Sequence, residues 1–144
     1  MKKIYSVVLF VMLVGGICAQ EDLAPVNIEV RNTSDSINTE VQIIFEIDSN
    51  WIVYDSITGE DGPIPLTIKA NDDGYLVKPT LKKKYDELFA MDIYYIENKA
   101  VYEYIFHDKA VMEELVIEIE YMSCNLVSGV CLPPVNQLFT IPLK

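Results

Sequence analysis

Near the end of the chain the sequence reads Tyr121-Met122-Ser123-Cys124-Asn125-Leu126-Val127-Ser128-Gly129-Val130-Cys131-Leu132-Pro133-Pro134. Strand-like segments flank it, at residues 115–121 before it and 137–143 after it. Two cysteines between two strands can close a small loop. A glycine inside that loop and two prolines behind it give the loop a defined shape. The pair is therefore either a structural bridge or a working dithiol.

Alternation of apolar and polar residues predicts strands along the rest of the chain. We expect them at residues 26–30, 41–47, 66–70, 92–97 and 100–106, with another beginning at Trp51. Pro65 favours an edge position for the strand that follows it. The strands at 92–97 and 100–106 are expected to form a hairpin around Asn98-Lys99. Residues 82–91 are expected to form a loop or a single helical turn, and residues 107–114 a connection with some helical character.

About eight or nine short strands without a convincing long helix predict an all-β fold, an immunoglobulin-like two-sheet β-sandwich. Tyr102, Tyr104 and Phe106 share one face of their strand. Such a stripe is typical of core packing rather than of a binding platform.

The first 19 residues predict a secretory signal peptide. Lys2 and Lys3 give a basic start, residues 4–14 are almost wholly apolar, and small residues follow up to Ala19. The apolar run is short for a membrane span of about 20 residues. We expect cleavage after Ala19, one domain at residues 20–144, and a periplasmic or otherwise exported protein. Lipid modification of Cys18 is the alternative, disfavoured because Ile17 is larger than the usual preceding residue.

The charge of the chain is strongly negative. Its 11 Lys and Arg fall to 9 when Lys2 and Lys3 are removed, against 22 Asp and Glu, which gives a net charge of −13. Such a surface repels nucleic acid and anionic lipid. We interpret the charge as a source of solubility, and expect neither a nucleic-acid partner nor a small-molecule substrate.

Spacing alone favours a structural disulfide. Cys124 and Cys131 do not form a Cys-x-x-Cys motif, and closing so short a loop stabilises a fold by roughly 2–3 kcal/mol. In an oxidising compartment the bridge is the default state. Two thiols are too few ligands for a structural zinc site, and His107, the sole histidine, supports no catalytic triad. We therefore expect no metal and no cofactor.

The cysteine stretch resembles the signature of the N-terminal periplasmic domain of the thiol:disulfide interchange protein DsbD. In that family a strand ending in Tyr-x-x-Cys precedes a short loop and then Gly-x-Cys-aromatic-Pro-Pro. Two further blocks agree in order and separation. Trp51-Ile52-Val53-Tyr54 with Gly62-Pro63-Ile64-Pro65 looks like the family's aromatic strand and Gly-Pro-x-Pro stretch, and Tyr85-Asp86-Glu87-Leu88-Phe89 looks like its cap loop. The resemblance covers nearly the whole mature chain, and its cysteine block is the specific part.

The resemblance implies an immunoglobulin-like sandwich with a redox-active pair, in which Cys131 forms the mixed disulfide and Cys124 resolves it. Electrons would pass from a membrane partner to periplasmic thioredoxin-like proteins. The segment Asp86-Glu87-Leu88-Phe89 would cap the pair, with Leu88 or Phe89 as an apolar lid and Tyr54 nearby. A lid of this kind would exclude competing thiols, and the carboxylates of Asp86 and Glu87 would raise the cysteine pKa.

The chain departs from the family pattern in three respects. Its cysteine loop is one residue longer than the commonest spacing, and Leu132 stands where an aromatic residue is usual. These residues also contain nothing that resembles the family's membrane-spanning or thioredoxin-like domains. We therefore expect a separate membrane electron donor. The alternative is a non-catalytic β-sandwich that serves as a binding or scaffolding module and keeps the disulfide only as a structural bridge.

Overall fold

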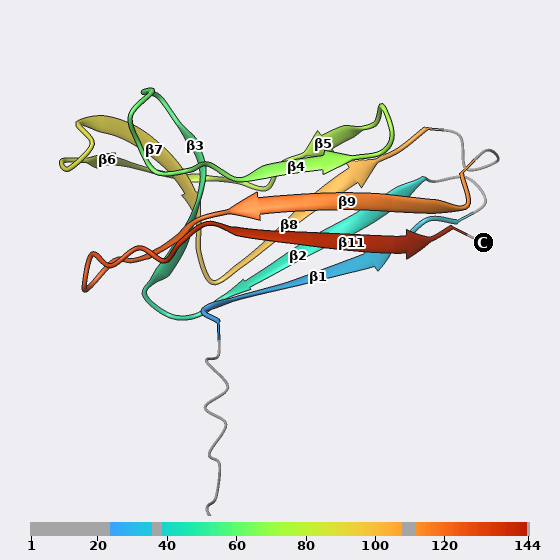
Figure 1. Ribbon diagram of the computed structural model, residues 1–144, viewed down its shortest axis with the longest axis horizontal. Helices are drawn as coiled ribbons and strands as arrows, with labels where there is room; N and C mark the ends of the chain where they lie inside the picture. The colour runs from blue at the N-terminus through green and yellow to red at the C-terminus, as the bar shows by residue number, and fades with distance from the viewer. Residues whose placement is uncertain (1–23, 36–38, 108–111, 144) are drawn as a thin grey trace, which may run out of the picture.

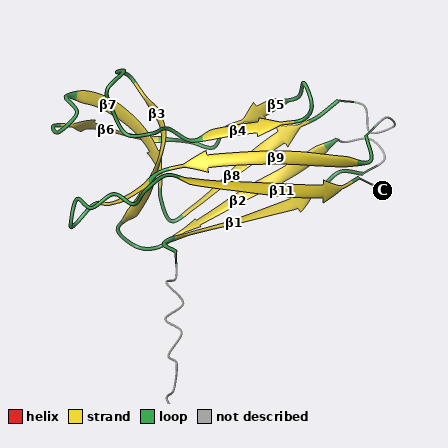
Figure 2. Cartoon of the chain, in the orientation of Figure 1, coloured by secondary structure: helices red, strands yellow, loops and turns green. Residues whose placement is uncertain are grey.

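The computed structural model describes residues 24–35, 39–107 and 112–143, and in these ranges the chain forms eleven β-strands and no helix (Figures 1 and 2). The strands are β1 (Val26–Asn32), β2 (Glu40–Ile47), β3 (Trp51–Ile57), β4 (Thr67–Ala70), β5 (Tyr75–Val77), β6 (Lys82–Asp86), β7 (Met91–Ile96), β8 (Lys99–Ile105), β9 (Glu114–Tyr121), β10 (Ser123–Asn125) and β11 (Val135–Pro142). None of the described residues belongs to a helix long and apolar enough to cross a membrane. The predicted signal peptide and Cys18 lie outside the described residues.

The strands form three antiparallel sheets. Sheet 1 has the order β1-β2-β8-β5, sheet 2 has the order β11-β9-β4, and a third sheet, which we call the end sheet, has the order β10-β3-β7-β6. Sheets 1 and 2 stack as a sandwich, and the end sheet lies at one end of its long axis (Figure 1). The all-β, immunoglobulin-like prediction is therefore confirmed, with two sheets forming the body and the end sheet added to them.

The core lies between sheets 1 and 2 and follows the alternation of the sequence. In β9, Leu115, Ile117 and Ile119 are 0% exposed, because every second side chain of a strand points to the same face. The aromatic stripe of β8 is likewise buried. The Phe45 ring lies 5.5 Å from the Tyr102 ring in an edge-to-face arrangement. The prediction that the stripe packs in the core is confirmed.

The hairpin predicted around Asn98-Lys99 is wrong. Strand β7 pairs with β3 and β6 in the end sheet, whereas β8 pairs with β2 and β5 in sheet 1. Asn98 has a φ of 57° and its carbonyl accepts a hydrogen bond of 2.7 Å from the Ile47 amide. The turn is therefore a corner, held by β2, at which the chain leaves one sheet and enters another.

The loop or helical turn predicted for residues 82–91 is wrong over its first half. Residues 82–86 form the edge strand β6, and a turn begins only at Glu87. Lys82 forms an ion pair with Glu97, and Lys83 forms one of 2.9 Å with Asp92. Lysines are common on edge strands because they discourage pairing with another chain.

The edge position predicted for the strand after Pro65 is confirmed by β4.

Three further differences concern short elements. Strands β5 and β10 were not predicted, because three residues are too few to show a period. The helical character predicted for residues 107–114 is absent from the described part of that segment, and residues 108–111 lie outside the description. Between β9 and β10 the chain crosses at Met122 from sheet 2 to the end sheet. Cys124, in β10, therefore belongs to the end sheet, one strand after the chain leaves sheet 2.

Candidate functional site

The two cysteines form a disulfide at the end of the sandwich. Cys124 lies in β10 and pairs with Ile52 of β3, while Cys131 faces it as an isolated antiparallel bridge with a Cα–Cα distance of 4.0 Å. The Asn125 amide donates to the Val130 carbonyl at 2.8 Å, and the Leu132 amide donates to the Ser123 carbonyl at 2.9 Å. These bonds flank the bridge on both sides, which is the arrangement of a close, non-hydrogen-bonded antiparallel pair. In the oxidised protein, backbone hydrogen bonds and the covalent bond therefore close this loop together.

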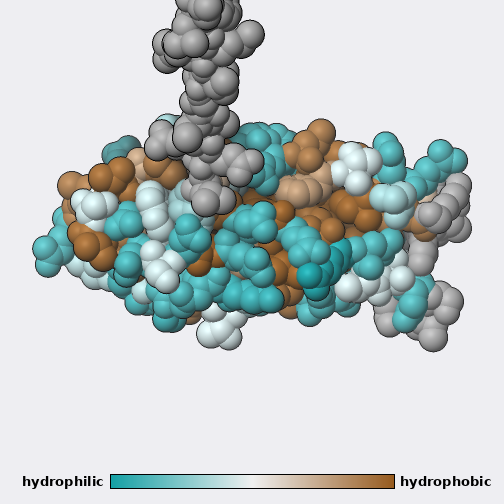
Figure 3. Space-filling model, turned by 90° about the horizontal axis from the view of Figure 1, so that it is seen from below, coloured by the Kyte–Doolittle hydropathy of each residue, from teal (hydrophilic) through white to brown (hydrophobic). Residues whose placement is uncertain are grey.

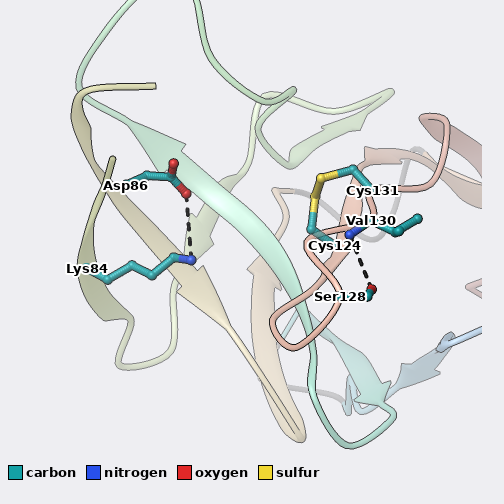
Figure 4. The surroundings of a disulfide bond; sticks show 6 residues. All are labelled: Lys84, Asp86, Cys124, Ser128, Val130 and Cys131. Carbon is teal, nitrogen blue, oxygen red and sulfur yellow. Dashed lines mark hydrogen bonds and ion pairs between the residues drawn. A yellow bond between two sulfur atoms is a disulfide. The ribbon is translucent and has the colours of Figure 1, made fainter. Parts of the chain in front are cut away.

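The loop between the cysteines is organised by Asn125. Its side-chain oxygen accepts hydrogen bonds from the amides of Val127 at 2.9 Å and Ser128 at 3.0 Å. Gly129, at a φ of +71°, closes the turn by donating from its amide to the Asn125 carbonyl at 2.9 Å. Ser128 adds a weaker contact of 3.3 Å from the Val130 amide to its hydroxyl (Figure 4). Sequence reasoning missed Asn125, although an asparagine that opens a Ser-Gly turn is a recognisable signal.

The two cysteine residues differ in exposure. Cys124 is 4% exposed and belongs to a small second core with Ile52, Tyr54 and Ile93. Cys131 is half-buried and packs at the margin of this cluster. The side of the disulfide that solvent or a partner reaches more easily is therefore that of Cys131.

A pocket of about 180 Å³ lies against the disulfide. Its lining comes from β3, from β6 with the turn after it, and from the cysteine loop: Tyr54, Lys84, Asp86, Leu88, Phe89, Cys124, Asn125, Leu126, Gly129 and Cys131. The structure thus brings four of the five expected surrounding residues together with both cysteines. Glu87 is the exception, since it is exposed and is not part of the lining. Lys84 was not predicted, because nothing in a run of three lysines distinguishes the one that faces a pocket.

The turn after β6, residues 87–90, is held by Asp86. Its carboxylate accepts hydrogen bonds from the amides of Leu88 at 3.0 Å and Phe89 at 3.3 Å, and its other oxygen lies 3.7 Å from the Lys84 ammonium (Figure 4). Leu88 is 84% exposed, whereas Phe89 is half-buried. Phe89 is therefore the more enclosed of the two apolar side chains that this turn brings to the pocket.

The charge of Asp86 extends into the pocket. Burial, and then repulsion from the Asp86 carboxylate, raise the pKa of Tyr54 above its ordinary value. Tyr54 packs with Cys124, and Asp86 and both cysteines line the same pocket. Among the described residues, no three His, Cys, Asp or Glu side chains gather in a way that could hold a metal ion.

Exposed apolar side chains occur on the cysteine loop and on the turn after β6. The cysteine loop contributes Leu126, Val127 and Val130, which are 44%, 79% and 55% exposed, and the turn after β6 contributes Leu88. We call these four residues the apolar rim. Hydrophobic residues also reach the surface at this end of the molecule in the view of Figure 3. Apolar surface gathered in one place is typical of a contact site for another protein.

Comparison with known families gives a match over residues 20–143 to the family described as Thiol:disulfide interchange protein DsbD, N-terminal. Comparison with curated proteins gives no match.

Two solved structures from Neisseria meningitidis share the fold. The reduced DsbD N-terminal domain is 21% identical, with a TM-score of 0.60 over 80% of this chain and 83% of that one. A complex between the DsbD N-terminal and PilB N-terminal domains gives 22% identity and a TM-score of 0.59, over 83% of this chain and 87% of that one.

Proposed function

The chain belongs to the family of the DsbD N-terminal domain, a thiol–disulfide exchange module, and on this premise we propose that it relays reducing equivalents through Cys124 and Cys131. The observation that carries the proposal is a disulfide flanked on both sides by backbone hydrogen bonds and set against a pocket, with one cysteine residue more exposed than the other.

The exchange proceeds in two displacements. The Cys131 thiolate attacks one sulfur of a partner disulfide, which forms a mixed disulfide and releases the partner's other sulfur as a thiolate. The Cys124 thiol then loses its proton and attacks the Cys131 sulfur. The Cys124–Cys131 bond forms, the mixed disulfide breaks, and the partner leaves as a dithiol that has gained two electrons and two protons.

The greater exposure of the Cys131 residue supports its role as the attacking thiol. The Cys131 sulfur must approach the partner in line with the partner's breaking disulfide bond, which requires Cys131 to be accessible from outside the protein. Cys124 is 4% exposed and packs against Tyr54, so it is suited to an attack that stays within the loop. The hydrogen bonds that the Asn125 side chain accepts from the amides of Val127 and Ser128 support the second displacement, because they would keep the reduced thiols within reach of each other.

The apolar rim supports a protein partner rather than a small thiol. Its side chains are exposed on the cysteine loop and on the turn after β6, and two of them, Leu88 and Leu126, line the pocket beside the disulfide, where a second domain could cover them. The Neisseria meningitidis DsbD N-terminal domain forms a complex with a PilB N-terminal domain. We propose a thioredoxin-like periplasmic protein as the partner of this chain, and a separate membrane protein as its electron donor. DsbD N-terminal domains in general are periplasmic, which agrees with the export predicted from the sequence.

The turn after β6 is proposed to act as the cap. Phe89 would shield the disulfide in the free protein, and the Asp86 carboxylate would hold the cysteine pKa up until a partner displaces the turn. We assign no role to Glu87 in this scheme, because it does not line the pocket.

The reduction potential of the Cys124–Cys131 bond tests the proposal. A working pair should equilibrate with glutathione buffers at about −180 to −270 mV, whereas structural bridges lie below roughly −300 mV. A Cys124→Ala variant should trap a mixed disulfide with a thioredoxin-like domain, and the matched Cys131→Ala variant should not. A potential well below −300 mV, with no trapped species, would contradict the proposal and favour the alternative, a binding module whose disulfide is only structural.

A further inference from the structure

A buried carboxylate adjoins the site but takes no part in the exchange proposed above. Asp55 follows Tyr54 in β3, and its side chain is only 1% exposed. The register between β3 and β7 shifts between Tyr54 and Ser56, so Asp55 is the extra residue of a β-bulge. Bulges re-aim neighbouring side chains, and they are common beside functional sites.

The Asp55 carboxylate connects the end sheet to the sandwich. The Tyr102 hydroxyl of β8 donates to one carboxylate oxygen at 2.6 Å, and the Lys78 ammonium donates to the other at 2.7 Å. Tyr102 is 0% exposed, whereas the Lys78 side chain is 47% exposed. The buried anchor of Asp55 is therefore the hydroxyl of a core tyrosine in the other sheet.

An acid at this position is not required for packing. Burying a charge costs more free energy than burying an apolar side chain of similar size. A buried polar pair is therefore better explained as a contact that favours one conformation of the backbone over others. Next to the bulge the Tyr54 carbonyl accepts a hydrogen bond of 2.7 Å from the Leu66 amide. The strand is thus fixed from two directions at the point from which Tyr54 reaches the disulfide.

We propose that the Asp55–Tyr102 hydrogen bond is a positioning device that holds the bulge of β3, and thereby the Tyr54 ring, against Cys124 and the cap. Tyr54 packs with Cys124 and lines the same pocket as Asp86 and Phe89. When the bulge is held, the ring closes the inner wall of that pocket. When the bulge relaxes, the ring moves and the disulfide becomes easier for a small thiol to reach. The purpose of this arrangement rests on the proposed exchange function, but its effect on access does not.

The test is the rate at which dithiothreitol reduces the disulfide in the folded protein. Tyr102→Phe removes one oxygen atom and leaves Asp55 without its buried donor. We expect reduction to become about twofold to tenfold faster, the range that corresponds to the net contribution of one hydrogen bond. Asp55→Ala should give a similar increase, whereas Asp55→Asn, which keeps an oxygen to accept the Tyr102 proton, should restore most of the wild-type rate.

Tyr104→Phe is the matched control. Tyr104 lies two residues further along β8, and its hydroxyl donates to the Asp72 carbonyl at 2.9 Å, so the variant loses one tyrosine hydrogen bond away from the bulge. Its stability should fall while its reduction rate stays at the wild-type value. Equal rates in Tyr102→Phe and the wild type, or an equal increase in Tyr104→Phe, would overturn the proposal. If Asp55→Ala does not fold, the two tyrosine variants decide alone.

The two proposals can fail separately. Failure of the exchange function would be seen in the wild-type protein, as a reduction potential in the structural range. Failure of the positioning role would be seen only in the variants, as reduction rates that do not follow the Asp55–Tyr102 contact.

Discussion

Replacing Asn125 by alanine should make the disulfide easier to reduce. The Asn125 side chain accepts two backbone hydrogen bonds, from Val127 and Ser128, and these hold the turn between the cysteines. In the oxidised protein the covalent bond also closes this loop. In the reduced protein only hydrogen bonds do, so the substitution should disorder the reduced loop more than the oxidised one. When the two thiols come within bonding distance less often, formation of their disulfide is less favourable. The reduction potential of the pair therefore becomes less negative.

The size of the effect follows from the two contacts. At roughly 1 kcal/mol of net contribution for each hydrogen bond, their loss amounts to about 2 kcal/mol. For a two-electron couple about 1.4 kcal/mol corresponds to 30 mV, so the upper limit is a shift of about 40 mV towards less negative values. The flanking bonds from Asn125 to Val130 and from Leu132 to Ser123 remain, since backbone atoms make them. We therefore expect a shift of about 10 to 40 mV.

The assay is equilibration of the purified protein in glutathione buffers, followed by alkylation and quantification of free thiols. Ser128→Ala is the matched control in the same loop, because the hydroxyl of Ser128 accepts only one contact, of 3.3 Å. Its potential should stay within about 10 mV of the wild-type value, as expected for a weak hydrogen bond. An Asn125→Ala potential equal to that of Ser128→Ala, or more negative than the wild type, would refute the view that this side chain organises the reduced pair.

Two further predictions concern the cap and the sandwich. Asp86→Asn should lower the pKa of Tyr54 in a spectrophotometric titration, because the carboxylate disfavours the phenolate, although burial should keep that pKa above its ordinary value. The exposed Glu87→Gln is its control, and an equal shift in both variants would show that the effect is not local. Gly74→Ala should cost at least about 2 kcal/mol in chemical denaturation, because an added Cβ would lie 2.2 Å from the Ile105 carbonyl oxygen, an atom of the backbone that cannot swing aside. A loss below about 0.5 kcal/mol, within the range of ordinary surface substitutions, would contradict that argument.

Most of the strands could be predicted because their signal is local. Ile117, Ile119 and Tyr121 alternate with Glu118 and Glu120, and burial of one face is enough to explain the pattern. The cysteine stretch was equally readable, since the two thiols and the glycine between them lie within one short segment. The cap was predicted only from a resemblance to a family and stays a proposal, while the structure places Asp86, Leu88 and Phe89 in the lining of the pocket beside both cysteines.

The pairing of strands could not be predicted in the same way. Residues 92–97 and 100–106 alternate as the arms of a hairpin would, yet they lie in different sheets, because each strand finds its partners through packing against distant segments. Lys82, Lys83 and Lys84 look unlike a strand by composition. They form one because β7 offers a ladder beside them and acidic residues lie within reach of their side chains.

The all-β character of the chain and a cysteine pair in a short loop can be read from the amino-acid order, because those properties depend on neighbours a few residues apart. Other features arise only when distant segments pack together: a separate end sheet holds the pair, Glu87 lies outside the pocket while Lys84 lines it, and Asp55 meets Tyr102. The last two residues are 47 positions apart. A contact over that distance leaves no periodic trace in the sequence, because it exists only once the end sheet has packed against the sandwich.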